Sequence, residues 1–311
     1  MSKALGLCWL LLLGQPLFGQ DGFFQFSHPQ MGTEFSIQVY TADSSLLEET
    51  IRQAWDTLDR LNQILSDYLP GSDLNRFCRE SPQSTAWQLL NGHLWTVLFA
   101  AKQMAILSDG AFDPTVGPLS RLWRKAFRRQ VFPDSQLIEK ALKQVDFRAL
   151  KLGAYPHARL DSPLSQLDLG GIAKGYAVDV LGDLLLEKGF SCFLIDGGGD
   201  LRIGVSPPGK LGWRIQFPDG THQDLSLLAL ATSGDRYRYL YQHGKRYSHL
   251  IDPRTGFGVS HGYAVSVEAT SCTHADALAS ALSILGPDQG RAWLSSQPIQ
   301  FFYPSKAVFY P

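Results

Sequence analysis

The chain has 311 residues, 44% of them hydrophobic and 18% charged, which is typical of a folded globular protein with one large domain or two. Its 28 basic and 29 acidic residues give a net charge of −1. No electrostatic field therefore favours nucleic acid as a partner, and we expect none.

The first 19 residues have the pattern of an export signal. Lys3 precedes an apolar run over residues 4–13, and glycine and proline residues then interrupt that run. The run is too short to span a bilayer as a stable helix. We therefore expect residues 1–19 to be a signal peptide and residues 20–311 to form the mature domain in the periplasm or a similar extracytoplasmic space. Retention as an uncleaved membrane anchor is the alternative.

The spacing of apolar residues predicts the elements of the mature chain. Residues 34–40 alternate as a strand, and residues 46–65 follow at helical spacing. Further helices are predicted at 87–107, 121–129, 133–145, from Gly170-Gly171 to Gly189, and at 273–285, with the basic stretch 121–129 in solvent. Further strands are predicted at 192–195, 201–205, 213–217, 225–232, 237–241 and 264–268.

Two segments interrupt this pattern. Residues 66–76 are polar, and residues 112–118 are too rich in proline and glycine for regular structure. Strands grouped around a few long helices predict an α+β fold, with mostly antiparallel sheets and packed helices.

Three cysteines lie outside the export signal: Cys78, Cys192 and Cys272. Their spacing matches neither a metal site nor a C-x-x-C motif, and three is an odd number. One disulfide is compatible with the sequence, but three thiols that pack as apolar side chains are the favoured interpretation.

The helix that follows Gly170-Gly171 has Lys174 in its first turn. A helix N-terminus carries about half a unit of positive charge, so a lysine there is unfavourable unless an anion lies at the same place. Backbone N–H groups, which the glycines allow a ligand to approach, would bind that anion. The sequence therefore favours a phosphate site at Lys174. A lysine whose stem only covers apolar surface is the alternative.

The two faces of this helix differ. Lys174 shares its face with apolar Val178, whereas Asp179, Asp183 and Glu187 fall on the face expected to meet solvent. If Lys174 conflicts with the helix dipole, Lys174→Met should leave the stability of the ligand-free protein equal or slightly raised.

The last predicted helix has Thr273, Asp276 and Ser280 on one stripe, because residues three and four apart are neighbours on a helix. A carboxylate and a hydroxyl together suit a hard cation, which takes oxygen ligands. A polar helix face in water is the alternative.

A further segment, residues 248–256, places His249 and Arg254 around a predicted tight turn. His249 could remove a proton near neutral pH, and Arg254 could pair with phosphate. A structural histidine is the alternative. The glycine-rich segment 195–200 is not a dinucleotide-binding fingerprint, because Arg202 occupies the position of the last glycine.

Taken in order, these segments resemble the ApbE family, the FAD:protein FMN transferases. The matching segments are Met31–Phe35, Ser66–Tyr68, Gly110–Pro118, Asp168–Gly175, Ile195–Asp200, Thr232–Asp235, Tyr247–Gly256 and Ala275–Ser280. Together they cover nearly the whole mature chain.

The resemblance implies an activity, a fold and a site. The activity is transfer of the FMN half of FAD to a Ser or Thr of a partner protein, with release of AMP and a requirement for Mg²⁺. The fold is a tunnelling-like core with a smaller helical portion. The FAD site would be lined by Met31, Tyr68, Ala111, Phe112, Asp113, Asp168, Lys174 and Leu250. The metal would be bound by the backbone oxygen of Gly171, by Asp276 and by the hydroxyl of Ser280, and His249 would activate the acceptor hydroxyl.

The implied partner is a flavoprotein subunit that carries the target Ser or Thr, expected to be extracytoplasmic and linked to redox chemistry. Two other functions use the same site. One is a pyrophosphatase that cuts FAD into FMN and AMP, with water in place of the acceptor hydroxyl. The other is a non-catalytic periplasmic flavin-binding protein, and the presence of Asp276, Ser280 and His249 together argues against it.

Overall fold

The computed structural model describes residues 22–81, 86–162, 164–234, 239–296 and 306–311. The predicted signal peptide, residues 1–19, lies outside this range, as do the first two residues of the strand predicted at 237–241. No helix in the described ranges combines the length and the apolar character needed to cross a membrane.

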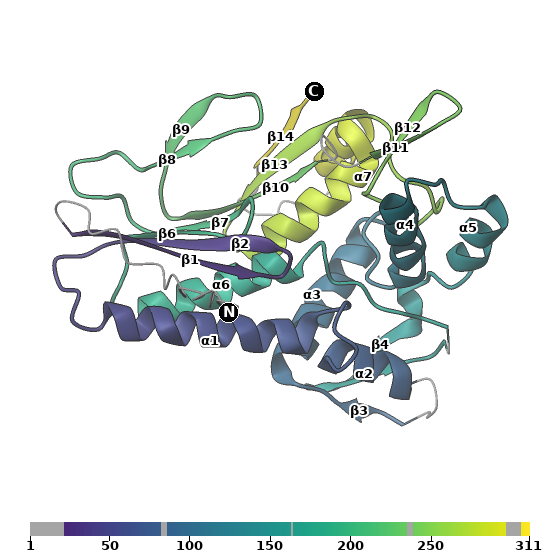
Figure 1. Ribbon diagram of the computed structural model, residues 1–311, viewed down its shortest axis with the longest axis horizontal. Coiled ribbons are helices and arrows are strands. Elements are labelled where there is room, and N and C mark those ends of the chain that lie inside the picture. The colour runs from purple at the N-terminus through teal and green to yellow at the C-terminus, as the bar shows by residue number, and fades with distance from the viewer. Residues whose placement is uncertain (1–21, 82–85, 163, 235–238, 297–305) are drawn as a thin grey trace, which may run out of the picture.

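A seven-stranded sheet forms the centre of the fold (Figure 1). All of its neighbouring strands pair antiparallel. In spatial order they are β1 (Phe23–Gln30), β2 (Thr33–Tyr40), β6 (Phe193–Asp196), β7 (Asp200–Ile203), β10 (Leu228–Gly234), β13 (Ala264–Ala269) and β14 (Lys306–Tyr310). The sheet and the helices packed on it confirm the predicted α+β class.

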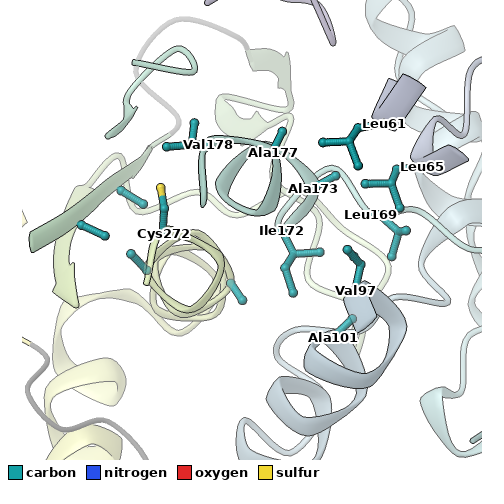
Figure 2. Close-up of a cluster of buried hydrophobic side chains, with 14 of the residues drawn as sticks. Leu61, Leu65, Val97, Ala101, Leu169, Ile172, Ala173, Ala177, Val178 and Cys272 are labelled. Atoms are coloured by element: carbon teal, nitrogen blue, oxygen red, sulfur yellow. The ribbon is translucent and has the colours of Figure 1, made fainter. Parts of the chain in front are cut away.

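Helices cover one face of the sheet. Side chains of β2 alternate, so that Phe35, Ile37 and Val39 are fully buried in the same cluster as the helices. These helices are α1 (Leu47–Leu65), α3 (Gly92–Leu107), α6 (Ala173–Glu187) and α7 (Cys272–Ser296). Figure 2 shows Ala177 of α6 between Leu61 of α1 and Cys272 at the start of α7.

The opposite face of the sheet contacts the hairpin of β8 (Trp213–Gln216) and β9 (His222–Leu225). Trp213 and Ile215 of this hairpin are buried against Leu194 and Leu230 of the sheet. The sheet therefore has two apolar faces, each with its own cluster.

The remaining elements form smaller units beside the main sheet. A third cluster of buried apolar residues joins two helices to a β-hairpin. The helices are α4 and α5, and the hairpin is formed by β11 and β12, whose bounds are given below. The helices outside the main layer are α2 (Asp73–Glu80), α4 (Gly117–Arg129), α5 (Ser135–Leu142) and the short 3₁₀ helix Phe147–Ala149. The strands are β3 (Gln88–Leu89), β4 (Leu150–Leu152), β5 (His157–Leu160), β11 (Tyr239–Gln242) and β12 (Lys245–Ser248).

Local chemistry explains where the elements differ from the predictions. The polar segment 66–76 contains the start of α2, because the Ser72 hydroxyl accepts a hydrogen bond from the N–H of Asn75 and caps the helix. Helix α4 begins before residue 121, with Pro118 in its first turn, where the missing N–H costs nothing. The strand predicted at 225–232 is interrupted at Leu227, which has a φ of 54°.

The basic stretch 121–129 is helical, as predicted, but its description as solvated is wrong. Trp123, Ala126 and Phe127 are buried in the third cluster, and Arg124 points toward the cavity described below. Helix α7 also exceeds its prediction. The predicted end at Leu285 coincides with a kink at Gly286, whose φ is 73°, but the chain then continues as helix to Ser296. Cys78, Cys192 and Cys272 are free thiols.

Asp179 of α6 caps the start of α7, contrary to its predicted place on a solvent face. Its carboxylate accepts hydrogen bonds at 2.8 Å from the N–H groups of Cys272 and Thr273. It also accepts from the hydroxyls of Thr273, at 2.6 Å, and Ser271, at 3.0 Å. The N-terminal N–H groups of a helix have no partner within the helix, so Asp179 fixes α7 against α6.

Asp179→Ala should therefore lower the free energy of unfolding by about 1–3 kcal/mol, because a cap is lost and buried donors remain unpaired. Urea denaturation measures this change. The matched control is Asp183→Ala, one turn further along α6, whose exposed carboxylate pairs with Arg202 at 2.7 Å. A surface change of that kind should alter stability by less than about 0.5 kcal/mol. Equal losses in the two variants would contradict the assignment.

Candidate functional site

A cavity of about 400 Å³ opens between α4, α6, α7 and the segments around residues 111–113 and 249–251. All of the site residues implied by the family resemblance except Met31 line it. They are Tyr68, Ala111, Phe112, Asp113, Asp168, Gly171, Lys174, His249, Leu250, Asp276 and Ser280. Segments far apart in the sequence thus meet at one place.

Met31 lies in the turn between β1 and β2, with a φ of 51°, and lines a shallow hollow of its own. The turn nevertheless approaches the cavity. A Cβ on Gly198, which lines the cavity, would lie only 2.4 Å from Oγ1 of Thr33.

Two buried carboxylates surround Lys174. Its Nζ lies 2.5 Å from Oδ2 of Asp200 and 3.7 Å from Oδ2 of Asp276. Asp200 and Asp276 are 3% and 4% exposed. The conflict between Lys174 and the helix dipole is therefore already offset within the protein, so for Lys174→Met the structure predicts a loss of stability rather than the equal or slightly raised stability expected from the sequence.

The charges of Lys174, Asp200 and Asp276 do not balance. Burial lowers the pKa of Lys174, but Asp276 and Asp200 outweigh this effect and raise the pKa well above its usual value. Burial, with the nearby charge of Asp276, raises the pKa of Asp200 to about 7. Burial also raises the pKa of Asp276. One ammonium group cannot neutralise two buried carboxylates, so the cluster favours a further cation or a proton.

Oxygen atoms gather beside this cluster. Gly171 faces Ser280 so closely that a Cβ at position 171 would lie 2.8 Å from the Ser280 hydroxyl. Asp276 lies one helical turn before Ser280 and accepts a hydrogen bond of 3.1 Å from the N–H of Gly175. A backbone carbonyl, a carboxylate and a hydroxyl are the hard oxygen donors that suit Mg²⁺.

The described ranges contain no cluster of three or more His, Cys, Asp and Glu side chains able to bind a metal ion. Mg²⁺ does not require such a cluster, because it usually binds through one or two carboxylates and completes its shell with water and substrate phosphates. Thr273 does not belong to the oxygen set, because its hydroxyl donates to Asp179 in the cap of α7.

His249 directly follows β12, on a segment whose backbone is held on both sides. The N–H of Ser248 donates to Val259 at 2.9 Å, and the N–H of Val259 donates to Leu250 at 2.8 Å. Arg254 does not line the cavity. Its guanidinium pairs instead with Asp252 at 2.9 Å.

The carboxylate of Asp113 is bound by nearby backbone N–H groups and by one hydroxyl. It accepts hydrogen bonds from the N–H and hydroxyl of Thr115, at 2.7 and 2.6 Å, and from the N–H of Phe147 at 3.0 Å. Burial raises the pKa of Asp113. Asp113 therefore shapes the cavity wall through the loop that also contains Ala111 and Phe112.

Comparison with known proteins identifies the family of this chain. The family model described as the ApbE family matches residues 31–303. This chain belongs to the ApbE family. FAD:protein FMN transferase of Vibrio cholerae is 33% identical over 285 residues, covering 86% of this chain and 82% of that protein. FAD:protein FMN transferase of Treponema pallidum is 31% identical over 305 residues, covering 89% and 84%.

Solved structures of ApbE proteins have the same fold. The flavin transferase ApbE from Vibrio cholerae superposes with a TM-score of 0.80 at 29% identity, covering 92% of this chain and 93% of that one. The flavinyl transferase ApbE of Pseudomonas stutzeri, in its apo form, gives a TM-score of 0.78 at 31% identity, covering 89% of each chain.

Two residues that line the cavity of this ApbE family member, Asp200 and Arg124, and the Arg124 partner Asp67 were not predicted as site residues. Asp200 follows a run of three glycines, and that position was the only signal for it. Arg124 lies in a stretch whose many basic residues suggested a solvated helix. Asp67, which binds Arg124, was noted only as part of a polar segment.

Lys174→Met should lower the free energy of unfolding by about 3 kcal/mol at neutral pH, because it leaves buried carboxylates without their partner. The pKa of Lys174 is raised on folding, so its contribution is complete at neutral pH. The pKa of Asp200 is also raised, to about 7, so ionised Asp200 opposes folding above that pH. Without Lys174 the pKa of Asp200 would be higher still, so the deficit should shrink as pH falls toward 7 and change little below it.

Urea denaturation in the presence of EDTA, on both sides of pH 7, tests this. The control is Lys188→Met at the exposed C-terminal end of the same helix, which should remain close to the parent. An unchanged or higher stability of Lys174→Met would show that the two carboxylates do not depend on Lys174.

Proposed function

We propose that this chain transfers the FMN part of FAD to a Ser or Thr hydroxyl of a partner protein, releases AMP, and uses Mg²⁺. The observation that carries the proposal is the convergence of Lys174, the oxygen set of Gly171, Asp276 and Ser280, and His249 on one cavity. Relatives that match most of this chain are named FAD:protein FMN transferase.

The wall around Lys174 suits a pyrophosphate. Breaking a pyrophosphate requires that negative charge be neutralised on the transferred phosphoryl group and on the leaving AMP. Lys174 and the N-terminus of α6 offer positive charge at one point, and the packing of α6 holds that charge in place. Bound Mg²⁺ would supply further neutralisation. Gly171, Asp276 and Ser280 would hold it, and the excess negative charge of Asp200 and Asp276 favours its binding.

His249 would act on the acceptor. As the acceptor oxygen forms its bond to the phosphorus of FMN, its proton must leave, and His249 on the cavity wall can accept it. The bond from that phosphorus to the AMP oxygen breaks, and AMP leaves with both electrons of the bond. In the hydrolytic alternative, water takes the place of the acceptor hydroxyl.

We further propose that the acceptor is an extracytoplasmic flavoprotein subunit with a role in redox chemistry. The support is the export-signal pattern of residues 1–19 in the sequence. The same pattern, if uncleaved, would associate the protein with a membrane.

The direct test is to incubate the protein with FAD, Mg²⁺ and a candidate acceptor, and to measure acceptor mass and AMP. An acceptor heavier by one FMN supports transfer, whereas free FMN and AMP with an unmodified acceptor would replace the proposal with the hydrolase. EDTA or Asp276→Asn should reduce product by at least about a hundredfold if the carboxylate is a metal ligand. Asp288→Asn, an exposed position of α7, is the matched control.

His249→Ala should slow transfer by about a hundredfold to ten-thousandfold, the usual contribution of a general base, while FAD affinity stays close to that of the parent. Single-turnover transfer and equilibrium dialysis of FAD measure the two effects separately. His274→Ala, which removes an exposed histidine of α7, should change neither. A parent-like transfer rate in His249→Ala would assign this histidine a structural role.

A further inference from the structure

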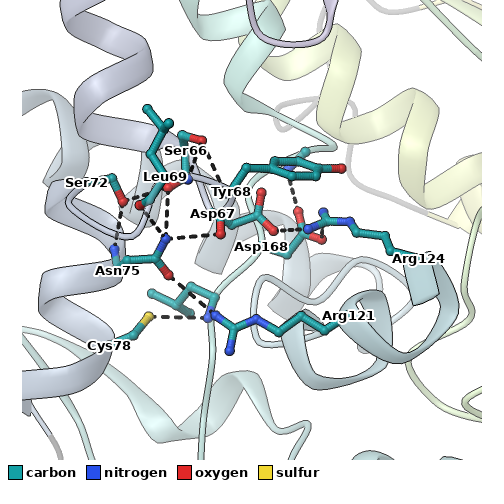
Figure 3. Close-up of polar contacts among 12 residues, drawn as sticks. Ser66, Asp67, Tyr68, Leu69, Ser72, Asn75, Cys78, Arg121, Arg124 and Asp168 are labelled. Carbon is teal, nitrogen blue, oxygen red and sulfur yellow. Dashed lines mark hydrogen bonds and ion pairs between the residues drawn. The ribbon is translucent and has the colours of Figure 1, made fainter. Parts of the chain in front are cut away.

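Tyr68 and Arg124 form a stacked pair at the wall of the cavity (Figure 3). Tyr68 lies in the loop between α1 and α2, and its side chain is 68% exposed. The Arg124 guanidinium lies over the ring, 4.1 Å from its centroid. A cation over an aromatic face at this distance is an attractive contact, and it fixes the plane of the ring.

The same guanidinium binds two carboxylates. One of its Nη atoms donates to Asp67, and the other donates to Oδ2 of Asp168 at 2.8 Å. The side chains of Asp67 and Asp168 are only 8% and 10% exposed. Burial, with the nearby charge of Asp168, raises the pKa of Asp67 to about 6 even with Arg124 bound. Arg124 therefore holds together two groups that would otherwise repel each other.

This contact joins three segments of the chain. Asp67 belongs to the loop after α1, Arg124 belongs to α4, and Asp168 precedes α6. Oδ1 of Asp168 accepts a hydrogen bond of 2.8 Å from the N–H of Gly170, the first glycine of the turn before Lys174. The plane of Tyr68 and the backbone of the Gly-Gly turn are thus both tied to Arg124.

Helix α4, which contains Arg124, is packed against the rest of the protein. Its neighbour Trp123 is 1% exposed and donates a hydrogen bond of 2.9 Å from its ring to the carbonyl of Gly256. Arg124 therefore extends to the cavity from a helix whose other side is packed.

We propose that Arg124 is a positioning residue of the substrate site, which holds the Tyr68 ring as a platform for a flat aromatic ring of the flavin nucleotide and holds Asp168 on the turn that faces its phosphates. The proposal rests on the proposed function, because it takes FAD as the ligand. A planar guanidinium can stack on the ring and bind two carboxylates at once, which the single ammonium group of lysine cannot do.

FAD affinity of the full chain, measured by equilibrium dialysis without Mg²⁺ or acceptor, tests the proposal apart from any transfer step. Arg124→Gln should weaken FAD binding by about tenfold, the loss expected from a cation–π contact and an ordered carboxylate pair. Arg124→Lys should recover only part of this loss. With Mg²⁺ and acceptor present, KM for FAD should rise more than kcat falls. Arg128→Gln, on an exposed face of α4, should bind FAD as the parent does.

A second variant separates positioning from stability. Arg124→Gln alone leaves Asp67 and Asp168 without their cation and lowers stability. The double variant Arg124→Gln/Asp67→Asn removes one charge of each sign, so it should regain thermal stability yet still bind FAD about tenfold more weakly. Recovery of FAD affinity together with stability would show that Arg124 serves the fold alone and would overturn the inference.

Different results would overturn the proposed function and the role of Arg124. If the parent protein does not bind FAD, the proposed function is overturned. If the parent binds FAD, and a folded Arg124→Gln variant binds it equally well, only the role of Arg124 is overturned. Weaker binding in both Arg124→Gln and the double variant, with Arg128→Gln unchanged, supports the inference.

Discussion

The close contact between the first turns of α6 and α7 is the constraint on which the site depends. A Cβ at Gly175 would lie 2.3 Å from the carbonyl oxygen of Cys272 and 2.8 Å from Cβ of Asp276. Only glycine permits this approach, so the N–H of Gly175 can donate to the Asp276 carboxylate. One turn further along α6, Asp179 caps α7 and fixes the two helices in register.

This contact brings together charges that would otherwise be expensive to bury. Lys174 comes from α6, Asp276 from α7, and Asp200 from the start of β7 in the central sheet. With two carboxylates to one ammonium group, the cluster retains an excess of negative charge in a buried environment. A protein that only needed to fold would gain by replacing it with apolar side chains. The proposed site for a cation and a phosphate group accounts for these buried charges.

Periodicity predicted the parts of the fold that have one clearly apolar face. Helix α1 and strand β2 were located within one residue of their ends. Strand β1 was missed, because it is an edge strand with no fully buried residue and many polar ones. Helix α2 was missed because it is short, so that its apolar stripe has only Leu74 and Phe77 as buried apolar residues.

The candidate site, too, could be predicted from the sequence only in part. The resemblance of eight ordered motifs to the ApbE family, together with the chemistry of Lys174, Asp276 and His249, indicated eleven of the residues that line the cavity. Which charges pair could not be predicted, since Lys174 meets Asp200 only through the packing of α6 on the sheet. Nor could spacing show that Arg124, one of several basic residues on α4, is the one that contacts Tyr68.

The most direct measurement compares alanine at two glycines of α6. In Gly175→Ala the new methyl group meets the backbone of α7, whereas in Gly182→Ala the nearest atoms belong to a side chain, that of Arg202, at 2.4 Å from Cδ. The account predicts that Gly175→Ala loses about 1–3 kcal/mol of stability and most FMN transfer, while Gly182→Ala keeps its transfer activity. A Gly175→Ala protein that melts and transfers FMN as the parent does would contradict the claim that this contact builds the site.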